Sequence, residues 1–164
     1  MKEPNTRYIT QAAVIAAIYT ALSLALAPFS FGSIQVRVAE ALTVLPAIFP
    51  SAIPGLFIGC ILTNTIGTML GLSGGIIDIV FGSLATLLAA WVTYKLRKYT
   101  FLVPMPPVLV NAVVVGAILY YAFNLPLILT MLQVGVGQLI ACYALGLPLL
   151  FIIKKRNESK ADTL

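Results

Sequence analysis

The stretch ITQAAVIAAIYTALSLALA, residues 9–27, decides the fold class because it runs for 19 positions without a charged residue. A helix of this length rises about 28 Å at 1.5 Å per residue, close to the thickness of the hydrocarbon core of a bilayer. The whole chain has the same character, since 60% of its 164 residues are hydrophobic and only 9% are charged. Soluble domains carry about a quarter charged residues. The sequence therefore predicts an integral membrane protein built from hydrophobic helices.

Proline and glycine divide the rest of the chain into further apolar runs. Breakers lie at Pro28, at residues 71–75, at residues 104–107 and at residues 124–126. They leave three long runs at residues 75–94, 108–123 and 126–153. The last run exceeds the bilayer thickness, so we expect it to tilt or bend. Residues 36–70 are also apolar, but three prolines interrupt them and leave only short helical pieces.

The basic residues predict the orientation of these helices. Nine of the ten gather in three groups, near residues 2–7, 95–98 and 154–160, each beside an apolar run. This is the pattern of cytoplasmic ends under the positive-inside rule. The first two groups share a side only if an even number of crossings separates them, so residues 36–70 should cross twice; a re-entrant hairpin is the alternative.

The predicted fold is an all-α bundle of six transmembrane helices in one domain, residues 1–164, with both termini cytoplasmic. The expected spans are residues 9–27, 38–49, 53–66, 75–94, 108–123 and 126–153.

Several classes of function lack their motifs in this sequence. Histidine is absent, and the only cysteines, Cys60 and Cys142, are too far apart for a zinc motif, so we expect no metal or cofactor. The glycine-rich residues 71–75 lack the lysine of a phosphate-binding loop. No catalytic pair of nucleophile and base is present, so we expect no enzyme. The basic groups flank apolar runs instead of forming a basic face, which argues against nucleic acid as a partner.

Three charged residues, Arg37, Glu40 and Asp78, play no part in the orientation. A charge at the centre of a span costs about 2.5–3.5 kcal/mol on insertion scales, so its presence needs a reason. One reading is an ion pair that only ties helices together. The other is a polar pocket, open to the outside, whose acids accept hydrogen bonds from N–H groups of a substrate.

Uncharged polar residues at similar depth join this predicted pocket, whereas Asn111 ranks lower because the predicted topology puts it toward the inner side. The candidate ligand-binding residues are Arg37, Glu40, Asn64, Asp78, Tyr120, Gln133 and Gln138.

The first apolar run carries a ridge of small residues, with Ala13, Ala17, Ala21 and Ala25 spaced four apart. Such small-xxx-small patterns let a second helix approach closely. The partner helix could belong to the same bundle or to another subunit, and the pattern alone favours neither.

Residues 34–46, IQVRVAEALTVLP, resemble the signature of the QueT family, and the resemblance extends over nearly the whole chain in length, span layout and alanine ridge. The QueT family comprises substrate-binding S components of energy-coupling-factor importers, a branch of the ABC transporters. The resemblance implies a multi-pass protein of the bacterial plasma membrane that binds queuosine precursors, which are 7-deazaguanine bases. It also implies three partner subunits, namely a transmembrane scaffold and two ATPases, with Ala13, Ala17 and Ala21 contacting the scaffold.

Two other functions remain open at this point. An ion-coupled secondary transporter would use Asp78 or Glu40 as its titrating group. A structural membrane protein would use the three charges only to pin its helices.

Overall fold

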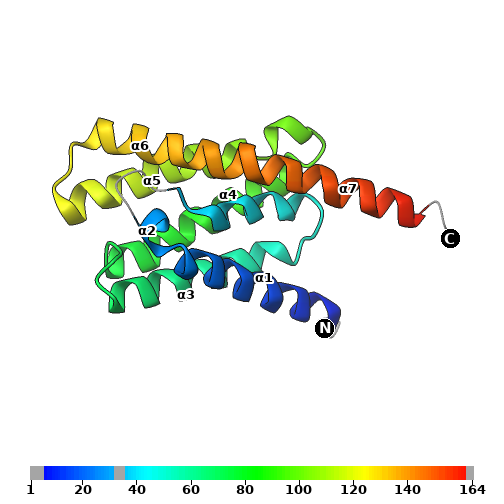
Figure 1. Ribbon diagram of the computed structural model, residues 1–164, viewed down its shortest axis with the longest axis horizontal. Helices are drawn as coiled ribbons and strands as arrows, with labels where there is room; N and C mark the ends of the chain where they lie inside the picture. Colours follow the sequence, from blue (N-terminus) through cyan, green and yellow to red (C-terminus); the bar gives the residue numbers. More distant parts are fainter. Residues whose placement is uncertain (1–5, 32–35, 162–164) are drawn as a thin grey trace.

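The computed structural model describes residues 6–31 and 36–161, and every regular element within these ranges is helical. The chain forms an elongated bundle in which both termini lie at the same end, with α7 extending beyond the rest (Figure 1). Lys2, Ile34 and Gln35, used above in the charge groups and the family motif, lie outside the described residues. The prediction of a helical protein without strands is confirmed for the described part of the chain.

The long helical stretches follow one another with alternating direction along the bundle, with α6, η4 and α7 forming one continuous stretch (Figure 1). In chain order they are α1 (Thr6–Ala25), α2 (Ala27–Ser30), η1 (Val38–Ala47), α3 (Ala52–Met69), η2 (Asp78–Gly82), α4 (Ser83–Lys95), η3 (Thr100–Leu102), α5 (Met105–Phe123), α6 (Leu127–Leu139), η4 (Ile140–Gly146) and α7 (Leu147–Ala161).

Four helical stretches are long and apolar enough to cross a membrane: Thr6–Ala25, Ala52–Met69, Thr100–Phe123 and Leu127–Asn157. They coincide with four of the six predicted spans. A fifth predicted span, residues 75–94, corresponds to an uninterrupted helical stretch over residues 76–95 that includes η2 and α4. The sixth, η1, is only ten residues long. The chain is therefore a helical membrane protein with several apolar helices.

The element η1 differs from the predicted α-helix over residues 38–49. It is a 3₁₀ helix that ends at Ala47 and contains Pro46. Proline has no N–H for an intrahelical hydrogen bond, so the end of a short, tight helix accommodates it better than an α-helix interior does. At about 2.0 Å of rise per residue, η1 reaches roughly 20 Å, which is less than the hydrocarbon core.

Two other helices begin earlier than predicted, because proline is well tolerated in the first turn of a helix. α3 starts at Ala52 with Pro54 in its first turn, and it continues to Met69. α5 starts at Met105, followed by Pro106 and Pro107. In both cases, prolines that the sequence suggested as helix breakers lie in the first turn of a helix.

The last run stays helical over residues 127–161, and its predicted irregularity takes the form of the π-helical segment η4. Pro148, the second residue of α7, lies just after this segment and removes one backbone donor from the helix. A π segment is a common way for a long helix to absorb such a local change.

Helices α1 and α3 pack closely through small residues on both sides. Gly55 lies so near α1 that an added Cβ would stand 2.7 Å from the carbonyl oxygen of Ala12, and a Cβ at Gly59 would stand 3.1 Å from that of Ala16. Ala12 and Ala16 are accordingly buried. The internal helix contact thus uses the stripe beside the predicted alanine ridge, not the ridge itself.

Candidate ligand-binding site

Five of the seven candidate ligand-binding residues line one small cavity inside the bundle: Arg37, Glu40, Asn64, Asp78 and Gln138. All five are buried. The cavity holds about 10 Å³, close to the minimum that one water molecule needs. The three charges that the sequence left unexplained are therefore gathered at one enclosed place.

Irregular helical segments supply several of these side chains. Glu40 lies in the first turn of the 3₁₀ helix η1, and Arg37 immediately precedes that helix. Asp78 begins the π-helical segment η2. A Cβ on Gly82, at the end of this segment, would stand 2.6 Å from Oδ1 of Asp78. The π segment and its glycine thus leave room for the Asp78 carboxyl group beside the cavity.

The Glu40 carboxyl group lies beside polar side chains of two other helices, Tyr19 on α1 and Asn111 on α5. The Tyr19 hydroxyl donates a hydrogen bond to its Oε1 at 2.5 Å. Its second oxygen, Oε2, is buried without a hydrogen-bond partner among the described residues. A buried acceptor without a partner is unfavourable, so Oε2 of Glu40 is an oxygen that can still accept a hydrogen bond.

Asn64 links the other two charged residues. Its Oδ1 accepts a hydrogen bond from Nη2 of Arg37 at 3.4 Å, and its Nδ2 donates to the backbone carbonyl of Asp78 at 3.0 Å. Both ends of the amide are therefore engaged within the protein. This network fixes the arginine and the π segment on either side of α3.

The Arg37 guanidinium group also lies over an aromatic ring. Its Cζ is 5.2 Å from the centroid of the Phe31 ring, a favourable cation–π distance. Its Nε is buried without a partner among the described residues. One N–H donor of the arginine thus remains unused beside the cavity.

Two candidate residues lie elsewhere. Tyr120, near the end of α5, has 48% of its surface exposed, and Gln133 on α6 is partly buried; neither lines the cavity. Their assignment to the ligand stays a prediction that this arrangement does not support.

The structure adds two residues that the sequence reading ranked low or omitted, Asn111 on α5 and Thr86 on α4. Asn111 is buried beside the Glu40 carboxyl group, and its Oδ1 has no partner among the described residues. It is the only amide in the predicted span 108–123. A single amide in an otherwise apolar span is the sequence feature that could have identified Asn111 as a site residue.

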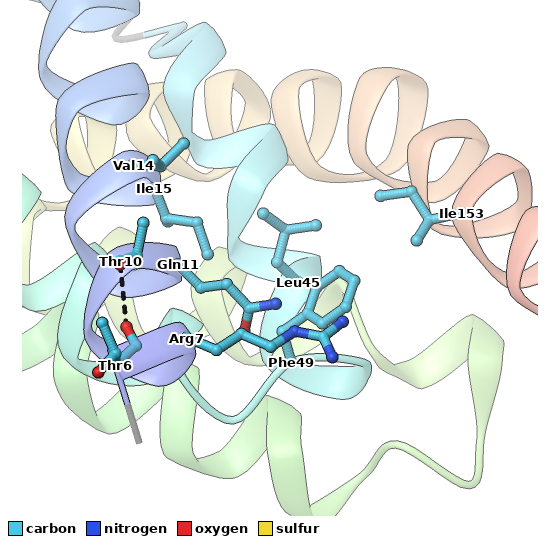
Figure 2. Close-up of a pocket in the computed structure, with 9 residues that line it drawn as sticks. All are labelled: Thr6, Arg7, Thr10, Gln11, Val14, Ile15, Leu45, Phe49 and Ile153. Carbon is cyan, nitrogen blue, oxygen red and sulfur yellow. Dashed lines mark hydrogen bonds between the residues drawn. The ribbon is translucent and has the colours of Figure 1, made fainter. Parts of the chain in front are cut away.

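A larger pocket of about 610 Å³ lies at the end of the bundle where the termini are, between α1, η1 and α7 (Figure 2). Its lining is mainly apolar, with Ile15, Leu45 and Phe49 among the contributors. Of its polar residues, Gln11 already accepts a hydrogen bond from Ser51 at 3.0 Å. This pocket is therefore less polar than the enclosed cavity lined by Arg37, Glu40 and Asp78.

Comparisons with known proteins agree with the picture of a helical membrane protein. A match to the QueT transporter family covers residues 9–155, nearly the whole chain. Comparison with curated proteins and with solved structures gave no match. The match spans every element that lines the cavity, and the family resemblance of the sequence is confirmed. The chain belongs to the QueT transporter family.

Proposed function

We propose that this protein is the substrate-binding S component of an energy-coupling-factor importer, and that it captures a queuosine precursor, a 7-deazaguanine base, from outside the cell. Membership of the QueT transporter family implies transport of queuosine precursors. The observation that carries the proposal is the convergence of Arg37, Glu40 and Asp78 on one buried cavity. Charges that merely pinned helices would not need to share a site with unpaired polar atoms.

The chemistry of the cavity suits a deazaguanine. Such a base presents a ring N–H next to an exocyclic amino group, and carboxyl oxygens are strong acceptors for such groups. Glu40 offers a buried oxygen without a partner. A precursor with an aminomethyl group would also carry a positive charge, which Asp78 would balance. Phe31, beside Arg37, is an aromatic group available for stacking on the ring.

Binding requires the helices around the cavity to separate. A bicyclic base is several times larger than a single water molecule, for which the cavity of about 10 Å³ barely has room. Close packing surrounds the cavity on more than one side, since Gly55 and Gly59 of α3 contact α1 and Gly146 of η4 contacts η1. The short η1, which carries Glu40, is one element whose displacement would enlarge the cavity.

In this proposal the chain crosses the bacterial plasma membrane six times, with both termini cytoplasmic. The three basic groups support this orientation, as does the position of both chain ends at one end of the bundle (Figure 1). The element η1 then forms the second, short crossing.

The partner subunits in this proposal are a transmembrane scaffold and two ATPases. The alanine ridge supports the scaffold contact, because Ala13, Ala17 and Ala21 are all exposed on α1. A surface of small side chains allows a partner helix to approach closely within the membrane. The ridge is free for this purpose because Ala12 and Ala16 already make the contact with α3.

The test begins with mass spectrometry of the small molecule retained by the detergent-purified protein. A 7-deazaguanine is the expected result, and failure to bind any heterocycle would favour a structural role. A second measurement separates the mechanisms of transport. An S component should co-purify with ATPase subunits and depend on ATP for uptake, whereas loss of uptake with an uncoupler at constant ATP would indicate an ion-coupled transporter.

A further inference from the structure

The unpaired polar atoms around the cavity define the hydrogen bonds that a ligand has to supply. Three such atoms lie in side chains that line it: Nε of Arg37, Oε2 of Glu40 and Oδ1 of Asn111. One is a donor and two are acceptors. Buried polar groups in proteins are nearly always paired, so the three unpaired atoms at this cavity are hydrogen-bond positions available to a ligand.

Several other acceptors around the cavity are already used by the protein. Oε1 of Glu40 accepts from Tyr19, and Oδ1 of Asn64 accepts from Arg37. Oδ2 of Asp78 accepts a long hydrogen bond from the backbone N–H of Gly74 at 3.4 Å. Two fully buried acceptors at the cavity, on Glu40 and Asn111, have no hydrogen-bond partner among the described residues, and they come from neighbouring side chains on different helices.

We propose that Asn111 is a specificity-determining residue that shares ligand recognition with Glu40. Oε2 of Glu40 accepts the ring N–H of the ligand, and Oδ1 of Asn111 accepts the exocyclic amino group beside it. The Arg37 Nε–H donates to the neighbouring carbonyl oxygen. The expected ligand is a planar heterocycle that carries, side by side along one edge, a carbonyl oxygen, a ring N–H and an amino group. This inference rests on the proposed function, and it replaces a bidentate carboxylate with two acceptors from η1 and α5.

Asn111 lies in a position that makes this role specific. It is buried, with 2% of its surface exposed, in a stretch of α5 that is otherwise apolar. A site that hydrogen-bonds a ligand amino group rejects an analogue that lacks it, because the buried acceptor is then left unpaired. Asn111 should therefore govern selectivity for the amino group more than overall affinity for the ring.

The test uses the full-length protein purified in detergent and two probes, 7-deazaguanine and 7-deazahypoxanthine, which differ only by the exocyclic amino group. Calorimetry should show that the wild-type protein prefers 7-deazaguanine by about tenfold or more. Asn111→Leu, which is close in size but has no acceptor, should bring this preference close to unity. Thr63→Val is the matched control, since Thr63 is equally buried and unpaired but does not line the cavity. It should keep the preference.

Each outcome bears on one of the two proposals. An unchanged preference in Asn111→Leu, or equal affinities for both probes in the wild-type protein, would overturn the role of Asn111 and leave the proposed function intact. Binding of neither probe by the wild-type protein would overturn the proposed function. If Asn111→Leu does not fold, Asn111→Ala and the wild-type comparison of the two probes decide the question.

Discussion

The hydroxyl of Tyr19 on α1 donates a 2.5 Å hydrogen bond to Oε1 of Glu40 on η1, and both side chains are almost completely buried. Tyr19 follows Ala17 and precedes Ala21, so the helix that carries the exposed alanine ridge also holds the central carboxyl group of the site. The position of α1 and the geometry of the site are thereby joined by one side-chain contact.

Tyr19→Phe should destabilise the protein, because it leaves a second buried oxygen of Glu40 without a donor. The expected loss is about 1–3 kcal/mol, which a thermal unfolding scan in detergent would show as a lower midpoint. Tyr143→Phe is the control, since it removes a tyrosine hydrogen bond, 3.1 Å to the Phe101 carbonyl, at the protein surface. Equal midpoints for the two variants would show that the Tyr19 contact adds nothing to stability.

Glu40→Gln should weaken binding of a 7-deazaguanine by about tenfold or more, since an amide presents one acceptor where the carboxyl group has two and loses its negative charge. Calorimetry on the purified protein measures this directly. Thr63→Val is the control, because it removes a buried polar group on α3 that does not line the cavity, and this variant should bind normally. Unchanged affinity in Glu40→Gln would remove Glu40 from the site.

Gly55→Ala should lower stability although alanine is the better helix former. The added Cβ would stand 2.7 Å from the backbone oxygen of Ala12, and backbone cannot move aside as a flexible side chain can. Overpacking of this kind costs about 1–3 kcal/mol. Gly135→Ala on α6 is the control, because its Cβ would meet only the Ala112 side chain at 3.5 Å. The thermal unfolding midpoint should fall for Gly55→Ala and rise for Gly135→Ala. A higher midpoint in both variants would contradict the close packing of α1 on α3.

Ala17→Leu should leave the isolated protein nearly as stable as before, within about 0.5 kcal/mol, because the side chain is exposed. It should nevertheless prevent co-purification with the ATPase subunits, since a larger residue keeps the scaffold helix away. Ala16→Leu, one position earlier and buried against α3, should instead destabilise the protein itself. Normal recovery of the ATPase subunits with Ala17→Leu would argue against the ridge as the scaffold contact.

The sequence by itself determined the class of the protein. Uninterrupted apolar runs can only be helices in a bilayer, where each backbone N–H and C=O has to be paired within its own segment. Breakers at Gly71, Gly75 and Asn124 were also readable, and all three have the positive φ angles that such residues tolerate. The three unexplained charges were found from the sequence because a charge inside a membrane is costly wherever it lies.

Only the tertiary structure decided which polar residues meet. The sequence allows the depth of each residue in the membrane to be estimated from the span boundaries. It does not show toward which neighbour each side of a helix points. For this reason Tyr120 and Gln133, at a suitable predicted depth, lie away from the cavity, while Asn111 and Tyr19 face Glu40. The same limit applies to the alanine ridge, which proved exposed because the rotation of α1 is fixed by the contact of Ala12 and Ala16 with α3. Helix rotation depends on packing between segments distant in sequence, and no local pattern encodes it.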